Sequence, residues 1–138
     1  MGLQASIDIK YHYEIEFKTL METLFNHGWT VENYSGIVYT IDDEDFNWKD
    51  AELSEKDVIM QLMFEAFSNN KLACIELSLP NLVGCSFHFM PGKRYIMLLV
   101  SIQRVKLENS NLTDYSFYIK KLLPILKNCA VITCSDAH

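Results

Sequence analysis

The chain has 138 residues, of which 49% are hydrophobic and 22% are charged, a composition that excludes a largely disordered protein. A chain of this length can bury on the order of two-thirds of the surface of its unfolded form, so we expect a single globular domain over residues 1–138. The formal net charge is −6, and the sequence contains no stripe of basic residues. We therefore expect no binding to nucleic acid, because phosphates require such a stripe.

The N-terminal segment lacks the basic and apolar regions of a signal peptide, and no run of residues is long and apolar enough for a membrane span. We therefore expect a cytoplasmic protein with no membrane contact. Disulfides are rare in that compartment. The four cysteines, Cys74, Cys85, Cys129 and Cys134, are accordingly expected to be free thiols.

The first two elements are predicted from a change in the spacing of apolar residues. Apolar and polar side chains alternate over residues 5–10, which indicates a half-buried strand. From Phe17 to Phe25 apolar residues recur at helical spacing, and Gly28 follows where a glycine ends many helices. A strand leading into a helix is therefore expected.

A hairpin and a second helix are expected next. The segments 29–34 and 37–41 are rich in β-branched and aromatic residues, and turn-forming residues separate them. Helical spacing of apolar residues returns from Val58 to Phe67. Ser54 is the expected N-terminal cap of this helix, because a serine hydroxyl can accept a hydrogen bond from the first turn.

Three strands, a helix and a final strand complete the chain. Alternating or continuous apolar residues predict strands over 72–79, 83–90 and 95–107, with proline-containing turns between them. The spacing over 115–126 predicts a third helix, and a short strand is expected over 130–134.

The predicted order β-α-β-β-α-β-β-β-α-β indicates an α+β fold. We expect an antiparallel or mixed sheet of about six to seven strands, with three helices packed mainly on one face. The residues expected in the core are Leu20, Leu24, Leu62, Phe67, Ile75, Phe87, Leu99, Leu122 and Leu126.

The charge is concentrated in residues 41–57, with the sequence IDDEDFNWKDAELSEKD. This stretch holds eight carboxylates against two lysines, so its balance of −6 equals that of the whole protein. Two aromatic residues, Phe46 and Trp48, lie among the charges, and such a composition is typical of protein-binding hot spots. The alternative is a solvated loop that leads into a helix. The candidate partner-binding residues are Asp42, Asp43, Glu44, Asp45, Phe46, Trp48, Asp50 and Glu52.

The motifs of the common enzyme classes are absent from the sequence. It contains no GxSxG elbow, no phosphate-binding glycine loop and no HExxH pair, so we predict no catalytic residues and no cofactor. Cys85 and His88 are three apart on an expected strand and would point to opposite faces, Cys85 into the core.

A metal site is also not predicted. A calcium loop starting at Asp43 fails, because Trp48 occupies the position that requires glycine and Ser54 the position that requires glutamate. At the end of the chain Cys134 and His138 lack the paired ligands of a structural zinc site.

The expected function is that of a non-enzymatic binding protein whose acidic patch docks on a basic protein partner. Small acidic domains without catalytic motifs occur, by broad analogy, among bacterial immunity proteins, which inhibit basic nuclease toxins. The alternative is a small enzyme or ligand-binding protein with a pocket between sheet and helices. A structural subunit of a larger assembly is a third hypothesis. The pocket of the second hypothesis would be lined by some of Tyr11, Tyr13, Trp29, Tyr39, His88 and Tyr95.

Overall fold

The computed structural model describes residues 3–32, 36–42 and 47–137, without the side chain of Ser101. The elements in chain order are β1 (Gln4–Tyr11), α1 (Phe17–Asn26), β2 (Ile37–Ile41), β3 (Lys49–Ala51), the 3₁₀ turn η1 (Leu53–Glu55), α2 (Lys56–Ser68), β4 (Ala73–Ser78), β5 (Gly84–Phe89), β6 (Tyr95–Ile102), α3 (Tyr115–Leu126) and β7 (Cys129–Ala137).

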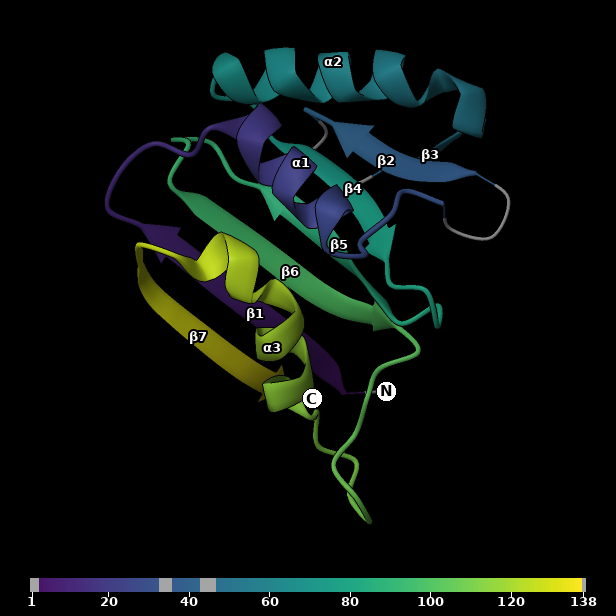
Figure 1. Ribbon diagram of the computed structural model, residues 1–138, viewed down its shortest axis with the longest axis vertical. Coiled ribbons are helices and arrows are strands. Elements are labelled where there is room, and N and C mark those ends of the chain that lie inside the picture. The colour runs from purple at the N-terminus through teal and green to yellow at the C-terminus, as the bar shows by residue number, and fades with distance from the viewer. Residues whose placement is uncertain (1–2, 33–35, 43–46, 138) are drawn as a thin grey trace.

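The seven strands form one sheet in the order β3-β2-β4-β5-β6-β1-β7, and every neighbouring pair is antiparallel. The three helices lie on one face of this sheet, with α1 between α2 and α3 (Figure 1). The predicted α+β class and the predicted order of strands and helices are thus confirmed. No helix in the described part of the chain is long and apolar enough to cross a membrane.

The strand predicted over residues 29–34 is not formed by the described residues of that segment. Residues 29–32 make only an isolated bridge, between Thr30 and Ser78, and residues 33–35 lie outside the described ranges. The apolar side chains of this segment serve the core instead: Trp29 is buried, its ring meets Phe87 edge-on, and its indole N–H donates to the carbonyl of Lys121. The second strand of the hairpin is β3, inside the acidic stretch.

The core lies between the helices and the sheet. Six of the nine residues predicted for it are buried: Leu20, Leu24, Phe67, Ile75, Phe87 and Leu122. Leu62 is a wrong prediction, because it is 42% exposed on the outer side of α2. The buried side of this helix carries Ile59, Met63 and Phe67, whereas Val58 and Leu62 repeat the same spacing one residue earlier and are exposed.

The other two predicted core residues are only half-buried. Leu99 pairs with Ser86 and Ser6 on the face of the sheet that has no helix, and Leu126 lies at the end of α3. The start of α2 also differs from expectation. Ser54 lies within η1, and among the described residues no side-chain hydrogen bond caps α2.

Candidate functional site

The structure places four of the eight predicted partner-binding residues. Asp42, Trp48, Asp50 and Glu52 are described and exposed, whereas Asp43, Glu44, Asp45 and Phe46 lie outside the described residues. Asp42 follows β2 with a positive φ of 53°, and its backbone N–H donates to the carbonyl of Leu72 at 2.7 Å. Its carboxylate lies 3.7 Å from the Lys71 ammonium, and both side chains are largely exposed. Such a surface pair contributes little to stability.

The described acidic residues do not lie on one face. β3 pairs with β2 so that Asp50 is opposite Val38, which places Asp50 on the face of the sheet without helices. Glu52 follows the strand and leads into η1 and α2, which covers the opposite face. The stretch therefore wraps around the β3 edge of the sheet and presents two different surfaces.

The surface on the helix side combines carboxylates with exposed apolar side chains. Leu53, Val58 and Leu62 are 40%, 59% and 42% exposed. Val58 and Leu62 are four apart, so they share one side of α2, and Glu65 continues that side one turn further. We call this the α2 surface, and its exposed residues are Glu52, Leu53, Glu55, Val58, Leu62 and Glu65.

The lysine of this helix does not neutralise the α2 surface. The Lys56 side chain is partly buried, and its ammonium lies 4.2 Å from the centre of the Phe25 ring of α1. The Lys56 ammonium therefore lies between α1 and α2 rather than on the α2 surface. The α2 surface is therefore acidic and apolar, a composition that the sequence did not predict because Leu62 was assigned to the core.

Trp48 points to the other face of the sheet. Its ring centre lies 6.0 Å from that of His88 at an angle of 82°, and the side chain stays 37% exposed. His88 itself is 1% exposed, although no helix of the described residues covers this face. Trp48 is thus part of a cover over the middle of the sheet, and the structure separates it from the α2 surface.

Beneath Trp48 lies a row of polar side chains that was not predicted from the sequence. The strand register places Thr40 beside Cys74 and Cys74 beside His88. The Cys74 Sγ atom lies 3.4 Å from His88 Nδ1, and His88 Nε2 lies 3.1 Å from Ser86 Oγ. Cys85 was the only cysteine considered as a partner of His88 from the sequence, and its side chain is buried in the core as predicted. The signal that could have found the pair is the tight turn between β4 and β5, which makes residues 74 and 88 direct neighbours.

The electrostatics of this row oppose a catalytic role. Burial raises the pKa of the Cys74 thiol to about 12 and lowers the pKa of His88 to about 4, so both groups are neutral near pH 7. A cysteine nucleophile needs the opposite shifts, toward thiolate and imidazolium. Thr40 Oγ1 is buried without a hydrogen-bond partner among the described residues. The row is a closed, neutral part of the interior.

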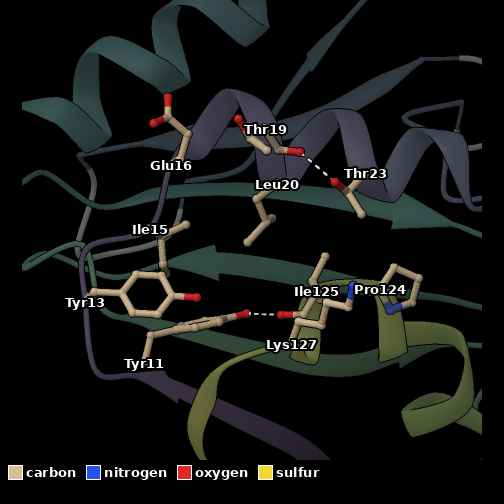
Figure 2. A pocket seen from close by; sticks show the side chains of 10 residues that line it. All are labelled: Tyr11, Tyr13, Ile15, Glu16, Thr19, Leu20, Thr23, Pro124, Ile125 and Lys127. Carbon is tan, nitrogen blue, oxygen red and sulfur yellow. Dashed lines mark hydrogen bonds between the residues drawn. The ribbon is translucent and has the colours of Figure 1, made fainter.

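A pocket of about 220 Å³ opens between α1, α3 and the segment that joins β1 to α1. Figure 2 shows Leu20 and Ile125 at its centre, with the Tyr13 ring alongside Tyr11. The Tyr11 hydroxyl donates to the Ile125 carbonyl at 2.7 Å, so it is already engaged. Of the six side chains predicted to line such a pocket, Tyr11 and Tyr13 do so. Its full lining is Tyr11, Tyr13, Ile15, Glu16, Thr19, Leu20, Thr23, Pro124, Ile125 and Lys127.

The other four predicted lining residues lie elsewhere. Trp29 is in the core and Tyr39 is on β2. His88 and Tyr95 lie on the face without helices, where the Tyr95 hydroxyl donates to the Asp8 carboxylate. All four cysteines are free, and among the described residues no three His, Cys, Asp or Glu side chains gather to hold a metal ion. Comparisons with protein-family models, curated proteins and solved structures found no match.

Proposed function

We propose that this protein is a non-enzymatic binding module that docks an acidic surface on a basic protein partner. The observation that supports the proposal is the α2 surface, where Leu53, Val58 and Leu62 are exposed among carboxylates. Adjacent exposed apolar side chains are characteristic of interaction sites, because they gain free energy only when a partner covers them. The carboxylates select a partner of opposite charge and accelerate its approach.

Asp42, Asp50 and Trp48 extend this site around the edge of the sheet. A partner bound around the β3 edge would meet Glu55 at the start of α2, and Asp50 with Trp48 on the face without helices. A basic nuclease toxin is one partner of this chemistry, since carboxylates would take the place of nucleic-acid phosphates, as in an immunity protein. The same charge disfavours nucleic acid and anionic membranes as ligands.

The test compares two double variants with the same net charge. Glu52→Gln/Glu55→Gln neutralises the α2 surface, and Glu14→Gln/Glu108→Gln neutralises two exposed carboxylates elsewhere. Surface plasmon resonance at two salt concentrations would measure association with a basic partner captured on the wild-type protein. We expect the first variant alone to associate several-fold more slowly and to lose part of its salt dependence. Equal effects from both pairs would reject the α2 surface as the docking site.

A second candidate function is the binding of a small aromatic molecule, which the pocket of Figure 2 favours. An engineered apolar cavity of about 150 Å³ admits benzene, so the volume of this pocket suits one ring. We expect indole to shift the NMR signals of Thr19, Thr23 and Ile125 in the wild-type protein. Leu20→Trp, which fills the pocket, should abolish these shifts, and Leu82→Trp on an exposed loop should not. Equal shifts in both variants would exclude the pocket as the site.

A further inference from the structure

The strand β7 forms an edge of the sheet that is unlike the other edge. It spans nine residues and pairs with β1 along its length, and no strand in the described ranges pairs with its outer side (Figure 1). The outward backbone groups of an edge strand are free to pair with another strand. The opposite edge, β3, has three residues and carries Lys49 and Asp50, which is the usual protection against such pairing.

The N-terminal part of β7 lacks that protection. From Cys129 to Ser135 the sequence is CAVITCS, without a charged residue or a proline. Toward the C-terminal end of β7, residues at or just before the start of α3 contact the strand. The Ser135 carbonyl accepts a hydrogen bond from the Tyr115 hydroxyl at 2.6 Å, and the Asp136 carboxylate accepts one from the Thr113 N–H at 2.8 Å. The open part of the edge is therefore residues 129–134.

The helix α3 adds an apolar flank to this open edge. Tyr115, Ile119 and Leu123 follow one another at intervals of four, so they lie along one side of the helix. Tyr115 contacts β7 through its hydroxyl, which identifies this side as the one that faces the edge. Leu123 is 57% exposed there. Lys127, which follows the last residue of α3, lines the pocket beside α1.

We propose that β7 pairs antiparallel with β7 of a second copy of this chain, and that Leu123 packs across the two-fold axis. The outward backbone groups of the open edge are available to another strand, and its uncharged side chains make a poor match for a charged partner. Antiparallel pairing of the segment with itself can bring Ala130, Ile132 and Cys134, which share the helix side, against the same residues of the second copy. Two-fold symmetric pairing is the commonest form of self-association.

This interface is independent of the proposed function, because β7 and β3 are opposite ends of the strand order. Pairing through β7 joins two seven-stranded sheets into one and keeps the helices of both copies on the same side. The α2 surfaces then lie at the two outer ends of the dimer, where both remain free.

The experiment is sedimentation equilibrium of the wild-type protein and three variants over a range of concentrations. We expect a dimer for the wild type, and dimer dissociation at least about tenfold stronger for Leu123→Glu and for Val131→Lys. Both side chains are more than half exposed in the single chain, so the fold should survive, which circular dichroism would verify. Val58→Glu is the matched control on α2, with similar exposure, and should dimerise as the wild type does.

Cross-linking through Cys134 provides a second readout. Pairing centred on Ile132 places the two Cys134 residues four residues apart along the strand, or about 13 Å. In a Cys129→Ser background, a bismaleimide of that reach should therefore link two copies through the exposed Cys134 thiols, and Cys134→Ser should remove the product. A monomeric wild type at all concentrations would overturn the proposal. So would a Leu123→Glu variant that dimerises as strongly as the wild type.

Discussion

Replacing Met63 with alanine is expected to lower the free energy of unfolding by about 2–5 kcal/mol, whereas Leu62→Ala, one residue earlier, should change it by less than roughly 0.5 kcal/mol. Met63 is fully buried in the core, and its truncation leaves a cavity that the surrounding side chains fill only in part. Leu62 is 42% exposed and loses few contacts. Both substitutions place alanine in the same helix, so helix propensity contributes little to the difference.

Urea unfolding followed by circular dichroism would measure both changes. A domain of this kind is stable by only about 5–15 kcal/mol, so the expected loss for Met63→Ala is a large fraction of the total. Equal losses for the two variants would mean that α2 is rotated about its axis relative to the structure. They would also remove Leu62 from the α2 surface and weaken the proposed docking site.

The fold could be predicted from the sequence because most elements carry a clear period. The alternation over β1 and β5, and the helical spacing over α1 and α3, assign buried sides from local residues alone. In α2 this reasoning failed by one residue, since Val58 and Leu62 repeat the spacing of Ile59 and Met63. Local pattern cannot distinguish a core-facing row from an exposed apolar row. That distinction depends on how the helix packs on the sheet.

The acidic stretch was predictable in composition but not in geometry. Its charge is evident from the sequence, and Asp42, Asp50 and Glu52 are exposed. What the sequence does not contain is the pairing of β3 with β2, which turns Asp50 and Trp48 toward the face without helices. The proximity of Cys74 and His88 likewise depends on the pairing of separate strands.

The two proposed interfaces have consequences for each other. The sheet ends in a short charged edge at β3 and in a long uncharged edge at β7. A dimer joined at β7 would carry two acidic surfaces at its far ends and could bind two basic partners, or two sites of one partner. Leu123→Glu would then reduce avidity for a bivalent partner without changing the affinity of each single site.

Acid is expected to destabilise this protein through His88, by about 2–3 kcal/mol between pH 7.5 and pH 4.5. Burial lowers the pKa of His88 from 6.5 to about 4, so the unfolded chain takes up a proton at a higher pH than the native protein does. Stability therefore falls as the pH drops below about 6.5, and the loss from this residue is complete below about 4. Above about pH 7.5 the histidine is neutral in both states and contributes almost no pH dependence.

Urea unfolding of the wild type and of His88→Gln at both pH values isolates this contribution. Burial raises the pKa of Asp136, but hydrogen bonds from Tyr115 and Thr113 outweigh that effect and lower it, so its contribution to stability is lost mainly below pH 4.5. Any such loss is common to both proteins. The free energy of unfolding of the variant can be lower than that of the wild type at both pH values. Its decrease from pH 7.5 to pH 4.5 should nevertheless be about 2–3 kcal/mol smaller than the decrease in the wild type. An equal difference in the two proteins would show that His88 is accessible to protons in the native state, and that the cover formed by Trp48 does not hold the imidazole in the interior.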